Sequence, residues 1–218
     1  FIHELLHEDH GSQMMHIVVL SPLPPSPYME ELLADPELGP HLFYIQGSPV
    51  HEKDLKRASV STAQGVFVLV DKFAPHPAAE DASSMLTALS IKRHCAAKAK
   101  RDVPMFLQLT RVQSKAHLMA VLPREMRMTV VCTEQLTHSL LALNATTPGI
   151  VTLLGNLISS ADVESVDREA DPATEEYLAG MDFEIYRVPL AGAYAGVPFQ
   201  VAAAIVYEET STLMFGLE

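Results

Sequence analysis

Apolar runs and amphipathic stretches alternate along most of this chain, and residues 64–94 show the pattern most clearly. The apolar run over 65–70 ends at a polar loop, after which Met85, Leu86 and Leu89 recur at helical spacing. A run that is apolar on both faces is typical of a strand in the middle of a parallel sheet, and the helical stripe that follows it can cover that sheet. The segment therefore predicts one βα unit of a doubly wound domain.

The charges of the predicted helix, over 79–94, agree with this interpretation. Glu80 and Asp81 fall in its expected first turn, and Lys92 and Arg93 fall in its expected last turn. Acidic groups near the start of a helix and basic groups near its end are favoured by the helix dipole. We expect these charged residues to stabilise the helix through its dipole.

The same alternation extends to Cys132. It predicts parallel strands joined by right-handed crossovers in one sheet, at 15–20, 42–46, 65–70, 105–109 and 128–132. It predicts helices at 1–8, 28–33, 49–58, 79–94 and 114–121. For the helix that starts at Pro49, Ser48 is the expected cap.

The pattern changes after Cys132. Residues 133–159 form one long helical segment that Pro148 and Gly149 break, which predicts two helices and a turn. An acidic stretch over 161–176 has no apolar period and predicts an exposed loop. The remainder predicts a small α+β subdomain with a strand at 181–188, a helix at 198–207 and a strand at 212–217.

The expected fold class is therefore α/β: a Rossmann-like, doubly wound parallel sheet with a helix–turn–helix crossover and a small C-terminal α+β subdomain. The expected divisions are 1–132 for the core, 133–160 for the crossover helices, and 161–218 for the acidic loop and subdomain. A doubly wound domain ordinarily opens with a strand and a glycine turn, and this chain opens on a predicted helix. We expect the first strand of the core to lie upstream of the chain.

Composition excludes several classes of function. The chain has 218 residues and a formal net charge of −12, which argues against nucleic acid or anionic lipid as a partner. Its two cysteines are far apart and form neither a CxxC pair nor a metal-binding spacing, which suits a reducing compartment. The longest apolar stretch, 140–158, is too interrupted to span a membrane.

Enzyme signatures are absent from the sequence. No GxGxxG is present, so the pyrophosphate cradle of a dinucleotide-binding fold is missing, and no GxSxG marks a serine nucleophile. Cys132 ends a predicted buried strand, where a packed thiol is commoner than a reactive one. We therefore expect no enzymatic activity, and a dehydrogenase or another Rossmann enzyme is the disfavoured alternative.

Eight short segments, in order along the chain, resemble the RCK domain (regulator of potassium conductance). The resemblance is specifically to the first of the pair in large-conductance, Slo-type calcium-activated potassium channels and their sodium-activated relatives. The segments are ELLHED (4–9), QGS (46–48) with DLKRA (54–58), AEDASSMLTALSIK (79–92), SKAHL (114–118), LALN (141–144) with TLLGNL (152–157), and YLAGMDFEIY (177–186). Each is weak alone, and their specificity comes from the ordered set.

The resemblance implies a cytoplasmic domain that follows a transmembrane pore, so that the protein meets the membrane only through that pore. It implies that each copy pairs with a second RCK domain of the same polypeptide. A homotetramer would then form a gating ring that opens the pore when an ion binds. Residues 133–159 would be the crossover that docks paired domains.

Carboxylates gather at two distant places in the sequence. Glu4, Glu8 and Asp9 crowd the end of the first predicted helix, where acidic groups oppose the helix dipole. Asp182 and Glu184 fall on one face of the predicted strand, because side chains alternate along a strand. Oxygen donors on irregular backbone suit Ca²⁺, which takes about six to eight oxygen ligands.

The resemblance implies a role for each of these positions. Asp9 and Glu184 match side-chain ligands of the calcium site, and Glu4 matches an acidic neighbour of that site. Asp182 falls where the family has a residue near the ion, and Ala161 where it has a backbone carbonyl ligand.

Three positions depart from the family pattern. Ser160 replaces a methionine that is tied to the function of the calcium site. His16 and Phe43 stand where the calcium-activated branch has two glutamates that bind Mg²⁺, so we expect that second site to be absent.

Other interpretations stay open. One alternative is a nucleotide- or Na⁺-sensing RCK-type regulator of a potassium channel or transporter; against the nucleotide form, the predicted second strand ends at Ser21 without a carboxylate to hold a ribose. His3, His7, His10 and His16 also suggest zinc, but no HExxH is present and surface histidines are favoured.

Overall fold

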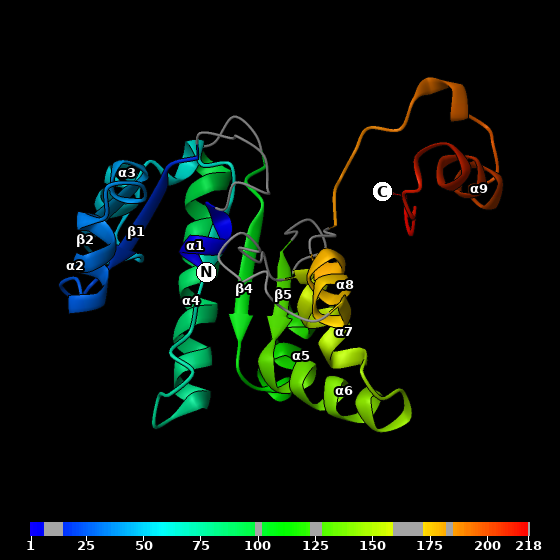
Figure 1. Cartoon of the computed structure of the whole chain (residues 1–218). Coiled ribbons are helices and arrows are strands. Elements are labelled where there is room, and N and C mark those ends of the chain that lie inside the picture. Colours follow the sequence, from blue (N-terminus) through cyan, green and yellow to red (C-terminus); the bar gives the residue numbers. More distant parts are fainter. Residues whose placement is uncertain (7–14, 99–101, 123–127, 159–171, 182–184, 218) are drawn as a thin grey trace. The chain divides into compact units, whose positions relative to one another are not determined.

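The computed structural model describes residues 1–6, 15–98, 102–122, 128–158, 172–181 and 185–217 (Figure 1). The chain divides into two compact units, Phe1–Asp182 and Phe183–Glu218. Among the described helices, none combines the length and the apolar composition that a membrane span requires. Each unit is taken by itself below.

Strands and helices alternate through the first unit. The strands are β1 (Ile17–Ser21), β2 (Leu42–Gln46), β3 (Val66–Val68), β4 (Met105–Leu109) and β5 (Thr129–Cys132). The α-helices are α1 (Ile2–Leu5), α2 (Pro27–Ala34), α3 (Glu52–Arg57), α4 (Pro77–Lys98), α5 (Val112–Val121), α6 (Thr133–Thr146), α7 (Ile150–Ile158) and α8 (Pro172–Met181), with 3₁₀ turns η2 (Gly39–His41) and η3 (Val60–Thr62). The expected α/β class is confirmed.

The strands pair in parallel, but in two hydrogen-bonded groups rather than one. One group has the order β1-β2 and the other has the order β3-β4-β5, and Figure 1 shows β4 beside β5. The expectation of one sheet therefore needs correction, because no hydrogen bonds join β1 to β3. Leu20 of β1 and Ile45 of β2 nevertheless pack against the cluster that contains Val68 and Leu107, so both groups border one core.

The core lies between β4 and the helices that cover one of its faces. Met105, Leu107 and Leu109 alternate along β4 and are buried. Ala88 and Ile91 of α4 belong to the same cluster, and α4 and α5 both contact β4. The alternate residues of β4 and the apolar stripe of α4 thus pack in one cluster, as the spacing of each predicts.

The strand β3 is buried on one face only, contrary to the expectation of two apolar, covered faces. Val68 is buried, whereas the neighbouring Phe67 is 42% exposed. The Phe67 ring lies on the other face of the sheet, where it stacks on Phe106 with ring centroids 4.7 Å apart and meets Phe1 edge-on at 5.2 Å. A strand with one bonded neighbour, in a group whose second face has little cover, cannot bury both sides.

The helix α4 is longer than its charges suggested. It runs from Pro77 to Lys98, so Asp81 lies beyond its first turn and Lys92 well before its last. Lys92 is buried, and its Nζ donates to Asp102 Oδ1 at 2.9 Å and to the Val103 carbonyl at 3.1 Å. The interpretation that these charges serve the helix dipole was therefore wrong for Asp81 and Lys92, which bond to other segments.

The break between α6 and α7 is confirmed. Gly149 has a φ of +88°, a conformation that side-chain-bearing residues rarely adopt, and its carbonyl accepts from Leu153 N–H at the start of α7. Neither α6 nor α7 contains a buried residue in this chain. The two helices form a hairpin that exposes several large apolar side chains, among them Leu141, Leu153 and Ile158.

The C-terminal part of the chain differs most from expectation. α8 begins at Pro172, inside the stretch expected to be an acidic loop, and Met181 ends that helix rather than starting a strand. The described residues of the second unit contain a 3₁₀ turn, η5 (Gly192–Tyr194), and the helix α9 (Phe199–Thr210), which confirms the expected helix. Residues 185–188 and 212–217 are irregular, so the strands expected there are not found. Alternation without a bonded neighbour does not make a strand.

Candidate functional site

Doubly wound proteins bind ligands beyond the carboxyl ends of their parallel strands. The backbone N–H groups of the turns and helix starts at this edge make it a ready site for anions. In this chain, the described turns at that edge are closed by side chains of the protein itself.

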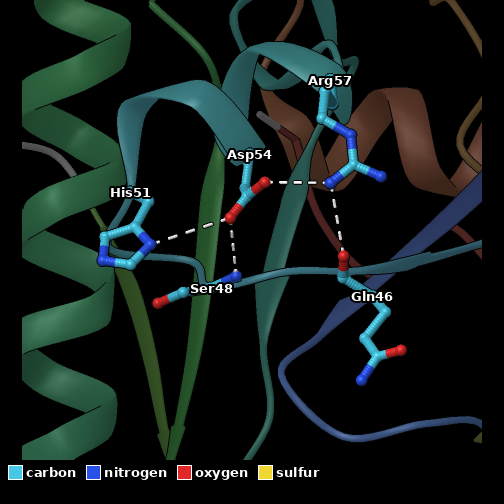
Figure 2. Close-up of polar contacts among 5 residues, drawn as sticks. All are labelled: Gln46, Ser48, His51, Asp54 and Arg57. Atoms are coloured by element: carbon cyan, nitrogen blue, oxygen red, sulfur yellow. Dashed lines mark hydrogen bonds and ion pairs between the residues drawn. The ribbon is translucent and has the colours of Figure 1, made fainter.

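The turn that joins β2 to α3 is built around Asp54 (Figure 2). Ser48 N–H donates to Asp54 Oδ2 at 3.0 Å, and Arg57 Nη1 donates to Asp54 Oδ1 at 3.0 Å and to the Gln46 carbonyl at 3.3 Å. His51 Nδ1 lies 3.8 Å from Asp54 Oδ2. The carboxylate therefore occupies the place beside the turn amide where a ligand anion could otherwise bind.

Gly47 is required by the closeness of Asp54. A Cβ at this position would lie 2.8 Å from Asp54 Cγ, and the Gly47 N–H extends the pairing of the two strands by donating to the Ser21 carbonyl at 2.9 Å. This arrangement also explains why Ser48 is not a helix cap, as we had expected. Its N–H belongs to the turn, and α3 begins four residues later with His51 as its N-cap.

These bonds lower the pKa of the Asp54 carboxyl below its ordinary value. The Ser48 N–H has the largest effect, and the hydrogen bond from the Arg57 guanidinium adds to it. Both donors favour the charged form of the carboxyl. Asp54 is thus held as a carboxylate at neutral pH.

The turn that joins β4 to α5 is closed by two carboxylates from other helices. Asp81 of α4 is fully buried, and it accepts from Thr110 N–H at 2.7 Å and from Arg111 N–H at 3.0 Å. Glu134 of α6 accepts from Val112 N–H at 2.8 Å. Arg111 is the N-cap residue of α5 and supplies no capping bond of its own. The backbone amides at the start of α5 therefore bond to carboxylates of the protein itself.

The loops after β1 and β3 are closed in a similar way. Tyr44 Oη donates to the Leu23 carbonyl at 2.8 Å, and Ser26 Oγ accepts from Met29 N–H to cap α2. Glu80 Oε1 accepts from Asp71 N–H at 3.4 Å in the loop after β3. At these two loops, Met29 N–H and Asp71 N–H thus already have side-chain acceptors within the protein.

Of the five residues predicted for the calcium site, one lies in the part of the chain that the structure describes. Glu4 lies in α1 and is half-buried. The other four lie outside the described residues: Asp9, Ala161, Asp182 and Glu184. Within the described ranges, no three residues among His, Cys, Asp and Glu are grouped so that they could hold a metal ion. The donor set of the prediction consists of oxygen atoms, which is the chemistry that Ca²⁺ prefers.

His16 and Phe43 lie together, as the resemblance requires of two positions that correspond to one family site. Their ring centroids are 5.7 Å apart, and the His41 ring lies 5.6 Å from that of His16. This His16–His41 proximity was not predicted from the sequence. With an imidazole and a phenyl ring in place of two glutamates, this pair lacks the oxygen donors that Mg²⁺ favours.

Sequence reasoning missed the carboxylates that close the turns. Asp54 was noted only within the DLKRA segment, and Asp81 was assigned to the helix dipole. A partial signal for Asp54 is present in the sequence, since Gly47 and Ser48 favour a turn and an Asp side chain can accept from nearby backbone N–H groups. No local signal exists for Asp81, because its partners Thr110 and Arg111 lie 29 and 30 residues away.

The lowered pKa of Asp54 predicts a pH dependence of stability. Because the folded pKa is lower than the unfolded one, the stabilisation is complete above the unfolded pKa, about 4, and is lost as the pH falls through the folded pKa. We expect the melting temperature of Asp54→Asn to lie below that of the wild type at neutral pH. The gap should narrow on acidification below about pH 4.

Thermal unfolding followed by circular dichroism across this pH range tests the expectation. Glu31→Gln, at an exposed position of α2, is the control for removal of a surface charge. A gap between wild type and Asp54→Asn that stays constant down to the acid limit would show that the carboxylate bonds do not contribute.

Comparisons with known proteins agree with this fold and its motifs. A family model described as the slowpoke-like RCK domain of calcium-activated potassium channels matches residues 1–120. A second, described as the alpha subunit of the calcium-activated BK potassium channel, matches residues 128–217.

Two individual proteins extend the comparison. The calcium-activated potassium channel slowpoke of Drosophila melanogaster is 26% identical over 220 residues, which cover 100% of this chain and 18% of that protein. The structure of the human SLO3 gating ring is similar with a TM-score of 0.68 at 21% identity, and the match covers 89% of this chain and 33% of that one. This chain thus spans a minor part of either relative.

The structural likeness establishes the fold, and the first family model alone covers more than half of the chain. The chain therefore belongs to the slowpoke-like RCK domain family of calcium-activated potassium channels.

Proposed function

We propose that this chain is a cytoplasmic, ligand-sensing regulatory domain of a potassium channel and that it helps to open the pore when Ca²⁺ binds. The observation that carries the proposal is the family match over residues 1–120, which contain the parallel strands β1 to β4 and the helices between them. The role is regulatory rather than catalytic. Its output is a change in shape that an attached pore domain can follow.

The closed turns support a cation rather than a nucleotide as the signal. Amides at the carboxyl ends of the strands already bond to Asp54, Asp81 and Glu134. Binding of a phosphate there would have to displace a carboxylate that lies within about 3 Å of its donors. The chain also has a formal net charge of −12, which attracts cations.

The proposed Ca²⁺ site consists of Asp9 and Glu184 as side-chain ligands, with Glu4, Asp182 and the Ala161 carbonyl nearby. Carboxylates brought together without a cation repel one another, so the site should close only around the ion. An ion shifts a two-state domain only by its differential affinity for the two states. Ca²⁺ must therefore bind the closed form more tightly than the open one.

This site predicts a specific loss of affinity. Asp9→Asn or Glu184→Gln should each weaken Ca²⁺ binding about tenfold or more, because each variant removes one charged ligand while it keeps the size of the side chain. Isothermal titration of Ca²⁺ into wild type and variants measures the effect. Glu80→Gln is the matched control, since Glu80 bonds to the loop after β3 and is not part of the proposed site.

Two outcomes would contradict parts of this proposal. Unchanged Ca²⁺ affinity in both Asp9→Asn and Glu184→Gln would refute the assigned ligands. Heat from Na⁺ but none from Ca²⁺ in the wild type would favour the sodium-sensing alternative over the calcium-sensing one.

The α6–α7 hairpin is the proposed docking surface. Leu141, Leu153 and Ile158 are 66%, 54% and 70% exposed, and neither helix buries a residue within this chain. Exposed apolar side chains on a helical hairpin favour a protein partner. We propose that a second RCK domain of the same polypeptide covers this surface, and that the full protein is a homotetramer attached to the membrane through its pore.

The docking proposal predicts self-association of the chain through the same surface. Wild type should show a concentration-dependent equilibrium in analytical ultracentrifugation. Leu141→Ser combined with Leu153→Ser should weaken it by about tenfold or more, because each substitution removes on the order of 1 kcal/mol of apolar burial. Val121→Ser, at a position of α5 that is 74% exposed, is the control. A strictly monomeric wild type at high concentration would contradict the proposal.

The two strand groups support a further strand between them. Among the described strands, β1 is bonded to β2 alone and β3 to β4 alone, yet both groups border one core. A parallel strand that precedes α1 in the polypeptide would join them in the order β2-β1-new strand-β3-β4-β5, which is the arrangement of a doubly wound sheet. We propose that such a strand belongs to the core.

A chain lengthened upstream by its natural sequence tests this proposal. The added strand would satisfy the free edges of β1 and β3, so amides on both strands should exchange hydrogen more slowly and the melting temperature should rise. The same number of residues in scrambled order is the control. Equal exchange in the two lengthened chains would count against an added strand.

A further inference from the structure

The helix α6 is attached to the core by polar bonds of its first turn. Its backbone at Glu134 donates to the Thr110 carbonyl at 3.1 Å, while the Glu134 carboxylate accepts from Val112 N–H at 2.8 Å. Lys115 Nζ also donates to Gln135 Oε1 at 2.8 Å. These bonds run in both directions between the first turn of α6 and the β4–α5 turn.

The turn that receives these bonds is itself held rigidly. Thr110 and Arg111 donate their N–H groups to the fully buried Asp81 carboxylate of α4, at 2.7 and 3.0 Å. α4 packs on β4 in the centre of the core. A continuous chain of hydrogen bonds thus leads from the core through Asp81 and the turn to Glu134.

Apolar packing against the core contributes little to the orientation of α6. The helix Thr133–Thr146 contains no buried residue, and Leu136, Leu141 and Leu143 are each more than two-fifths exposed. A surface helix ordinarily takes its orientation from an apolar face buried against the core. In α6, the bonds of the first turn, which include contacts of the Thr133 hydroxyl with the Leu109 and Thr110 carbonyls at 3.5 Å, supply a large part of that orientation.

We propose that Glu134 is a positioning residue for the docking surface: its carboxylate, anchored to the core through the turn that Asp81 holds, fixes the direction in which α6 presents its apolar side chains. This inference rests on the proposed role of the α6–α7 hairpin in docking. If α6 pivots about Cys132, only a fraction of molecules present the surface correctly. The apparent dissociation constant for docking then rises in inverse proportion to that fraction.

Three variants separate this role from a general loss of stability. Glu134→Ala removes the acceptor for Val112 N–H, whereas Glu134→Gln keeps a side-chain oxygen that can accept the same bond. Gln135→Ala, one residue further along, removes the bond from Lys115 and leaves Glu134 in place. Neither Glu134 nor Gln135 is buried, so the core should fold in each of the three variants.

The orientation of α6 is measured on dilute, monomeric protein by residual dipolar couplings of its amides, relative to those of α4 and β4. In wild type and Glu134→Gln, the couplings of α6 should fit the same alignment as the core. In Glu134→Ala they should be averaged toward zero, and hydrogen exchange at the Val112 amide should accelerate about tenfold or more. Couplings of α6 that still fit the core in Glu134→Ala would overturn the proposal.

Ultracentrifugation of the same variants tests the consequence for docking. Glu134→Ala should raise the dissociation constant of self-association about tenfold, Glu134→Gln should restore it, and Gln135→Ala should have the smaller effect. An unchanged constant in Glu134→Ala would also overturn the proposal. A monomeric wild type would instead refute the docking role of the hairpin, and the dipolar couplings would still decide whether Glu134 positions α6.

Discussion

The main constraint on this domain is the need to satisfy the backbone N–H groups where parallel strands end. These groups lie at one edge of each sheet, and leaving them without partners inside a protein costs stability. Many doubly wound proteins meet the need in part with a bound phosphate. This chain uses carboxylates of its own, chiefly Asp54 at the β2–α3 turn and Asp81 and Glu134 at the β4–α5 turn. Each carboxylate also joins two segments of the chain. The bonds that close the turns are therefore the same bonds that connect the parts of the core.

This arrangement divides the first unit into a connected core and an exposed hairpin. β4 and α4 supply most of the buried residues, and the turns around them are closed by short hydrogen bonds. α6 and α7 have no buried residues and expose several leucines. The core can therefore move as one body when a ligand binds, and the hairpin, which the Glu134 carboxylate joins to the β4–α5 turn, can carry that movement to a partner. Those are the properties that a domain needs if it is to transmit binding as movement.

Much of the fold could be predicted from the sequence because it depends on local patterns. β2 and β4 have the expected bounds, and Gly149 lies where the helical segment was expected to break.

The incorrect predictions concern long-range features of the fold. Sheet membership depends on which strands are bonded, and β1 and β3 are in different groups. The role of Asp81 depends on partners about thirty residues away, which a helical pattern does not reveal. The expected C-terminal strands are not found in 185–188 and 212–217, because alternation of side chains does not form a strand without a pairing partner.

The internal carboxylates also bear on what the domain can sense. An anion approaching the strand ends would find Asp54, Asp81 and Glu134 already bonded to the amides, and it would be repelled by their charge. A cation meets no such competition, and carboxylates that are not engaged in closing turns remain available to it. Asp9, Asp182 and Glu184, which belong to the proposed site, carry carboxylates, the group that Ca²⁺ prefers as a ligand. Turns whose amides are already bonded to internal carboxylates, in a protein of net charge −12, are the physical argument behind the proposal that the signal is a cation.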